Sequence, residues 1–162
     1  MNDIKVGKPL PLGSSITSGG VNFSLIATNA EYIEILLFEK EDSVAPKKIF
    51  KLDHMHNTGS YWHAEINNLK EGSIYAFRVK QNDNGLNKNY SKTVLIDPCS
   101  RGITGWSNYK RKNALNNIDN MDCCLKSVVC DRKSFNFKDF PRPKHSWKET
   151  IIYELHIKAF TQ

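Results

Sequence analysis

The chain has 162 residues, of which 40% are hydrophobic and 25% charged, and it carries a formal net charge of +6. These proportions are those of globular proteins and exclude disorder along the whole chain. No apolar run approaches the roughly 20 residues that span a bilayer, and the first residues lack the apolar region of a signal peptide. We therefore expect a cytoplasmic protein without a membrane partner.

Alternating apolar residues predict a series of short β-strands in the first hundred residues. After a lead-in rich in proline and glycine, the alternation favours strands at 20–27, 31–38, 48–52, 61–66, 73–80 and 92–97. The strand at 31–38 becomes apolar on both faces toward its end, which predicts a central place in a sheet. Short strands separated by turn signals, with almost no helical period, favour an all-β, immunoglobulin-like sandwich over residues 1–100.

The next segment, residues 101–148, differs in pattern from the sandwich. It contains one weak strand pattern at 126–131 and is otherwise irregular, with two prolines and many asparagines. Long structureless segments are uncommon inside compact domains, so we expect a linker that lies along the surface of a neighbouring domain.

Alternation returns at the end of the chain, in residues 149–162. From Thr150, a strand pattern places Ile151, Tyr153 and Leu155 on one face. A strand needs backbone partners, and none follows in the sequence. We therefore expect the first strand of a truncated domain, either poorly ordered or paired with another sheet edge.

Residues that carry metal or catalytic chemistry form no convincing pattern. The candidates are the histidines His54, His56 and His63, the carboxylate pairs Asp53–Glu65 and Glu149–Glu154, and the cysteines Cys99, Cys123, Cys124 and Cys130. The cysteines lack zinc-ligand spacing, and the histidines and carboxylates fit ordinary polar roles in turns and strands. No nucleotide-binding, nucleophile-elbow or zinc-protease motif occurs. We expect no catalytic residue, cofactor or metal.

Two tryptophans, Trp62 and Trp106, are candidate carbohydrate-binding residues, because a flat ring stacks on sugars at low entropic cost. Trp62 lies on an alternating strand, so core packing is the first interpretation of its role and a sugar platform the alternative. The basic run at 109–112, close to Trp106, raises a nucleic-acid surface as a further alternative. Because the other charges are dispersed, a solvated loop is favoured and no nucleic-acid partner is expected.

Several short motifs occur together in a fixed order along the chain. They are GKPLPLG at 7–13, GVNFSL at 20–25, YWHA at 61–64, GSIYAFRV at 72–79, LIDP at 95–98 and TIIYELHI at 150–157. This set resembles the N-terminal part of bacterial glycogen debranching enzymes and isoamylases, members of the α-amylase superfamily (glycoside hydrolase family 13).

The resemblance implies a sandwich similar to a family 48 carbohydrate-binding module, followed from Thr150 by the first strand of a (β/α)₈ catalytic barrel. It implies α-glucan as a partner through the parent enzyme, together with the missing barrel. The family's catalytic carboxylates lie at the ends of later barrel strands, so none is carried over to this chain. The loops at 39–48 and 81–90 lack the tryptophans of glucan-binding members, so support of the barrel is an alternative role.

The leading hypothesis is a non-catalytic N-terminal module of an enzyme that hydrolyses α-1,6 branch linkages of glycogen-like glucans. Such a module is expected to be inactive by itself. The alternatives are a stand-alone α-glucan-binding module and a basic domain that binds nucleic acid or protein.

Overall fold

The structure is a computed structural model that describes residues 3–81, 92–115, 118–131, 133 and 144–161. The chain divides into two compact units, Met1–Asp131 and Arg132–Gln162. Among the helices of the described ranges, none has the length and apolar character needed to cross a membrane. The loop expected at 81–90, beyond Gln81, and residues 134–143 of the expected linker lie outside the described residues.

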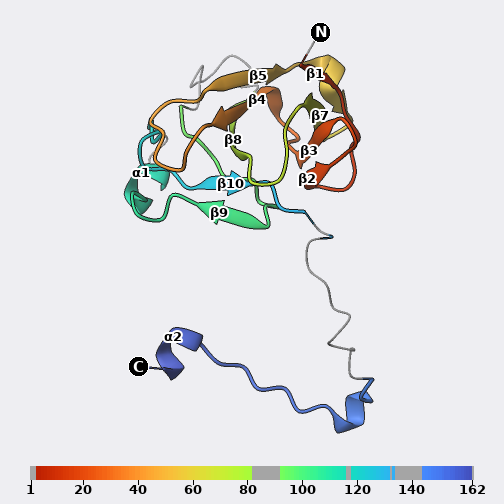
Figure 1. The fold of residues 1–162 in the computed structure, drawn as a ribbon, viewed down its shortest axis with the longest axis vertical. Helices are drawn as coiled ribbons and strands as arrows, with labels where there is room; N and C mark the ends of the chain where they lie inside the picture. Colours follow the sequence, from red (N-terminus) through yellow and green to blue (C-terminus); the bar gives the residue numbers. More distant parts are fainter. Residues whose placement is uncertain (1–2, 82–91, 116–117, 132, 134–143, 162) are drawn as a thin grey trace. The chain divides into compact units, whose positions relative to one another are not determined.

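The first unit consists of two antiparallel sheets (Figure 1). The first sheet has the order β1–β7–β3–β2, with β6 paired to β7, and the second has the order β5–β4–β8–β10–β9. The strands are β1 (Ile4–Val6), β2 (Gly13–Ile16), β3 (Gly20–Ile26), β4 (Ala30–Phe38), β5 (Lys48–Leu52), β6 (Asn57–Thr58), β7 (Tyr61–Asn67), β8 (Ile74–Gln81), β9 (Gly102–Thr104) and β10 (Lys126–Val128). The predicted all-β sandwich is confirmed, and five of its strands fall within about two residues of the expected ranges.

The main core lies between the two sheets. Its members are the alternate apolar residues of the long strands, which a two-residue period places on one face. They include Val21, Phe23, Leu25, Ile33, Ile35, Leu37, Phe50, Leu52, Ala64, Ile66, Tyr75 and Phe77. Each of the valine, leucine, isoleucine and phenylalanine side chains stabilises the fold by about 1.5–3 kcal/mol on burial, so the sequence period directly specifies this interior.

A second, smaller core covers the opposite face of the second sheet. Leu36 and Phe38, which point away from the main core, are buried with Ala76 against Val94 and Cys124. Strand β4 is therefore covered on both faces at its C-terminal end, and its register joins it to β5 on one side and β8 on the other. This confirms the central position predicted from its apolar pattern.

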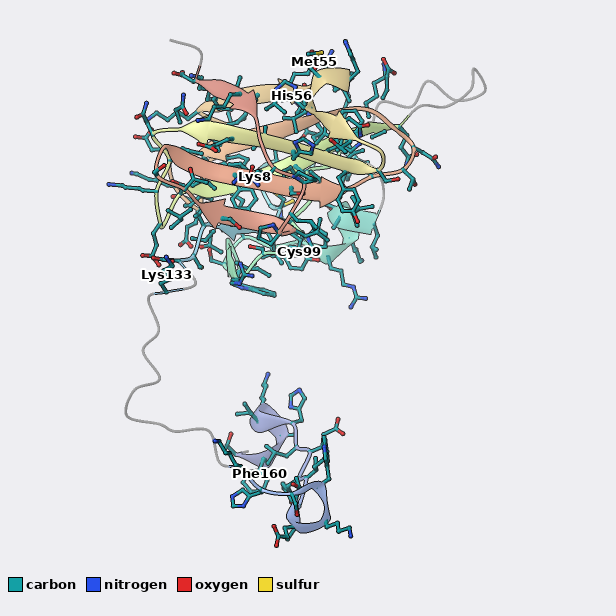
Figure 2. All side chains as sticks on the ribbon, turned by 90° about the vertical axis from the view of Figure 1, so that its right-hand side faces the viewer. Lys8, Met55, His56, Cys99, Lys133 and Phe160 are labelled. Carbon is teal, nitrogen blue, oxygen red and sulfur yellow. The ribbon has the colours of Figure 1, made fainter. Side chains whose placement is uncertain are left out.

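The lead-in before β2 crosses the outer face of the first sheet, where Lys8 lies over the strands (Figure 2). The Asn22 side chain accepts a hydrogen bond from the Lys8 amide at 2.7 Å and donates one to the Lys8 carbonyl at 3.0 Å. The Ser24 hydroxyl donates to the Pro9 carbonyl at 2.6 Å. These bonds satisfy the polar residues of β3 that the crossing segment buries.

The sandwich unit extends beyond residue 100, which differs from the expected boundary. Strands β9 and β10 lie in the sequence expected to be linker, yet β10 pairs with β8 and β9 pairs with β10. Backbone bonds of 2.9 Å in each direction join residues 72–73 to Val129. Strands β9 and β10 therefore complete the second sheet of the sandwich. The weak strand pattern at 126–131 corresponds to β10, whereas β9 is too short to show a period and is revealed only by its long-range partner.

The strand expected at 92–97 is reduced to a single bridge. Leu95 and Phe77 exchange two backbone hydrogen bonds of 2.8 Å. At Val94 the side chain of Asn120 takes the place of a partner strand, accepting from the Val94 amide at 2.7 Å and donating to its carbonyl at 3.1 Å. An amide side chain thus supplies the two bonds that a ladder would supply.

The described residues of the second unit form two short helices, η2 (Trp147–Glu149) and α2 (Ile157–Phe160). The strand expected from Thr150 is absent from its described residues, and Ile151 is 94% exposed. The last residue of the expected strand instead begins α2, where His156 Nδ1 accepts from the Ala159 amide at 3.2 Å. Without backbone partners an extended segment gains no ladder bonds, so the barrel strand stays a prediction.

Candidate functional site

The structure contradicts the sugar-platform interpretation of Trp62 and supports core packing. The residue lies on β7 and is only 4% exposed, within the main core. Its indole Nε1 donates to the carbonyl of Ala27 at 3.0 Å. A ring buried on both faces cannot stack on a ligand, so Trp62 serves the fold.

Trp106, in contrast, presents its ring to solvent. It is 65% exposed and meets Tyr109 edge-to-face, with ring centroids 6.0 Å apart and planes at 79°. The turn that carries both rings begins at Gly105, whose φ of +92° is a conformation that favours glycine. A Cβ at Gly105 would also lie 3.1 Å from the Cys124 carbonyl oxygen. The glycine therefore permits the turn that exposes Trp106.

The aromatic turn is tied to the rest of the sandwich at its base. The Thr104 hydroxyl donates to the carboxylate of Glu41, and the buried ammonium of Lys126 donates to the Glu41 carbonyl at 2.8 Å. The Lys110 amide donates to the Cys123 carbonyl at 3.2 Å, just before helix α1 (Arg111–Leu115). These bonds hold the backbone on both sides of Trp106 in place.

Beside the aromatic pair lies an open hollow of about 420 Å³. Tyr109 forms part of its wall, and the rest comes from Val44, Ser107, Asn108, Lys110, Asp122 and Cys123. Hydroxyl, amide, ammonium and carboxylate groups together offer both donors and acceptors, which suits a ligand rich in hydroxyl groups. The exposed ring of Trp106 supplies a flat apolar face next to these polar groups.

The Cys123 thiol in the wall of the hollow is not an activated nucleophile. Burial raises the pKa of the Cys123 thiol, and the hydrogen bond with Asp122 raises it further. The thiol therefore stays protonated at neutral pH, the form that is unreactive. The Asn113 side-chain amide donates to Cys123 Sγ at 3.2 Å, a structural contact beneath α1.

The candidate acid–base pair Asp53–Glu65 serves the fold. Asp53 accepts from the Met55 amide at 2.9 Å and contacts His56, whose hydrogen bond lowers the Asp53 pKa. Glu65 lies 3.0 Å from Lys5, and this bond lowers the Glu65 pKa. Both carboxylates are ionised at neutral pH and already engaged, so neither is a proton donor for hydrolysis.

The three histidines do not converge on one point. His54 and His56 lie in the short helix η1 (His54–His56), where His56 is next to Met55 at the surface (Figure 2). His63 is buried in β7, with Nε2 2.8 Å from the Thr58 hydroxyl, and burial lowers its pKa. In the part of the chain that the structure describes, no group of three or more metal-ligating side chains comes together.

Sequence patterns identify the aromatic residues of the Trp106 site but not its polar wall. Val44 and Asp122 are separated by nearly half of the chain and belong to no motif. They meet only because the loop after β4 and the segment before β10 fold over the same face of the second sheet.

The sandwich matches a known protein family. Residues 11–100 match the model of carbohydrate-binding module 48, described as the isoamylase N-terminal domain. The glycogen debranching enzyme of Pectobacterium atrosepticum is 29% identical over 169 residues, covering 100% of this chain and 25% of the relative. That of Erwinia tasmaniensis is 33% identical over 170 residues, with the same coverage. The chain thus spans about a quarter of the length of these curated relatives.

Among solved structures, the fold resembles that of the apo pullulanase from Paenibacillus barengoltzii. The TM-score is 0.53 at 20% sequence identity, over 78% of this chain and 15% of the pullulanase. At this identity the likeness concerns the fold alone, which agrees with the two-sheet sandwich.

Proposed function

The chain belongs to the carbohydrate-binding module 48 family, the isoamylase N-terminal domain, and from this membership we propose that it is the non-catalytic N-terminal module of a glycogen debranching enzyme. The parent enzyme hydrolyses α-1,6 branch linkages through the two-carboxylate mechanism of its superfamily. The support for this proposal is that the whole chain aligns with a quarter of each debranching enzyme.

The module's contribution in this proposal is contact with α-glucan at the Trp106 site. The observation that carries it is the exposed Trp106 ring, held edge-to-face against Tyr109 beside the polar hollow. Successive units of an α-1,4-glucan turn relative to one another, and two rings at a steep angle suit such a curved chain better than a flat one. The free thiols are in keeping with a cytoplasmic setting, which is part of the proposal.

The absence of catalysis is tested directly on the full chain. Incubated with branched glucan, the chain should release no reducing sugar, because barrel active sites are assembled from several strands. Turnover above the background of a heat-denatured sample would overturn the assignment as a non-catalytic module.

Sugar contact is tested by titrating the chain with maltoheptaose and, as a flat-chain comparison, cellohexaose. We expect the chain to bind maltoheptaose. The Kd should rise about threefold to tenfold in Trp106→Ala, which corresponds to the loss of one aromatic contact. Trp147→Ala is the matched control, because Trp147 is 86% exposed and lies in the second unit. No binding at millimolar maltoheptaose, or equal loss in both variants, would reject the Trp106 site.

A basic surface is distinguished from a sugar site by its salt dependence. Lys110, Arg111 and Lys112 follow Tyr109 directly, and phosphate binding by such residues falls steeply with salt. Maltoheptaose binding should be unchanged between low and physiological salt, since the sugar carries no charge. Binding of a DNA duplex that exceeds binding of maltoheptaose would favour the nucleic-acid alternative.

A further inference from the structure

A second hollow, separate from the Trp106 site, lies where the end of β4 and the start of β5 meet the turn between β7 and β8. Its volume is about 510 Å³, within the roughly 300–1,000 Å³ typical of small-molecule sites. The apolar lining includes Leu37, Leu69 and Ile74, and Lys47, Lys70 and Ser73 supply polar groups. We refer to this hollow as the lysine-rimmed groove.

The turn between β7 and β8 holds two of the polar groups in place. The Lys70 amide donates to the Ser73 hydroxyl oxygen at 3.1 Å, and the Ser73 amide donates to the Lys70 carbonyl at 3.1 Å. Gly72 supplies the positive φ, +83°, that such a turn needs. Reciprocal backbone bonds of 2.9 Å to Val129 brace the turn. The Ser73 hydroxyl accepts in this arrangement, so its hydrogen is left to donate.

The charges in the lining favour an anion, because three lysines outnumber the single carboxylate, that of Glu39. Lys47 is 3.8 Å from Glu39 in a solvent-exposed pair, and Lys48, also in the lining, pairs with Asp3. Across the described residues Lys70 takes part in no ion pair of this kind. The turn thus presents an uncompensated ammonium and a hydroxyl donor at the margin of an apolar surface.

We propose that the lysine-rimmed groove binds a small amphipathic carboxylic acid. The apolar body of the ligand lies on Leu37, Leu69 and Ile74, and its carboxylate binds the Lys70 ammonium and the Ser73 hydroxyl. A sugar fits less well, because the ring in the lining, Phe38, is only 6% exposed and leaves aliphatic side chains as the apolar surface. This site is independent of glucan binding and of the parent enzyme's reaction.

The proposal is tested by titrating the isotope-labelled full chain with octanoate and following backbone amide resonances. We expect the shifted resonances to cluster at Leu37, Ser73 and Ile74, with a Kd of about 1 mM, as befits a ligand of this size. Hexanoate should bind about fifteenfold more weakly, because it buries two fewer methylene groups. Neutral 1-octanol should also bind more weakly than octanoate.

Charge reversal at the turn gives the decisive comparison. Lys70→Glu should weaken octanoate binding about fivefold or more, whereas its effect on 1-octanol should be small. Lys70 is exposed, so the variant should fold, and Lys112→Glu on α1 is the charge-matched control. The proposal is overturned if the two variants bind octanoate equally, if hexanoate and octanoate bind equally, or if the shifts lie outside the groove.

Discussion

The buried hydrogen bond between Tyr75 and Asp97 gives the sharpest test of the fold's interior. Both side chains are buried, and the Tyr75 hydroxyl donates to Asp97 Oδ2 at 2.6 Å. Asp97 Oδ1 accepts from the Cys99 amide at 2.7 Å. Tyr75→Phe removes only the hydroxyl, because the ring and its edge contacts with Phe23 and Phe77 remain.

The expected loss of stability depends on pH. Burial raises the pKa of Asp97, while the Tyr75 hydrogen bond opposes that rise. A carboxyl whose pKa is raised on folding contributes stability below its unfolded pKa, ordinarily 3.8, and loses it as pH rises through the folded pKa. Removing the Tyr75 donor raises the folded pKa further and extends this loss to higher pH. We expect Tyr75→Phe to cost about 2–3 kcal/mol at pH 7 and about 1 kcal/mol at pH 4.

The assay is urea unfolding of the full chain at both pH values, followed by the fluorescence of the buried Trp62. Tyr61→Phe, a half-buried tyrosine on β7, is the matched control and should change the unfolding free energy little. A Tyr75→Phe cost that is the same at pH 4 and pH 7 would refute the coupling between this hydroxyl and an ionised Asp97.

Three other substitutions test separate features of the sandwich. Ile35→Ala in the main core should lower the unfolding free energy by about 3–4 kcal/mol, and a loss below 1 kcal/mol in urea unfolding would contradict tight packing there. Gly7→Ala should displace the lead-in, because a Cβ would lie 2.3 Å from Asn22 Oδ1 and 2.6 Å from the Ala64 carbonyl carbon. Unchanged amide-exchange protection around Asn22 would count against this displacement. Burial lowers the pKa of His63 below its ordinary 6.5, so the stability that neutral His63 contributes is lost as pH falls below about 6.5. His63→Gln should therefore make the unfolding temperature less dependent on pH below 6.5, as measured by thermal unfolding.

Much of the sandwich follows from local pattern. The strands β3, β4, β5, β7 and β8 show in the sequence because a two-residue alternation and the turn residues between strands are properties of neighbouring positions. The apolar outer residues Leu36 and Phe38 even indicate that β4 is covered on both faces. The ordered motifs likewise point to the family that the comparison of residues 11–100 shows.

Other features depend on contacts between distant parts of the chain. Strands β9 and β10 are three residues long and exist through their pairing with each other and with β8, so the boundary at Asp131 could not be read from composition. The strand pattern after Thr150, conversely, forms no strand in the described residues, because a period specifies faces but supplies no hydrogen-bond partner.

The two tryptophans show the same difference between what local pattern predicts and what distant contacts decide. The sequence identifies Trp62 and Trp106 as aromatic residues suited to stacking on sugar, but their exposure depends on what packs against them. Strand pairing and the main core enclose Trp62, whereas the turn after Gly105 leaves Trp106 in solvent next to Tyr109. Alternation along a chain determines which residues can be buried together. The tertiary structure decides which ring faces remain open to a ligand, because burial is set by neighbours that lie far away in sequence.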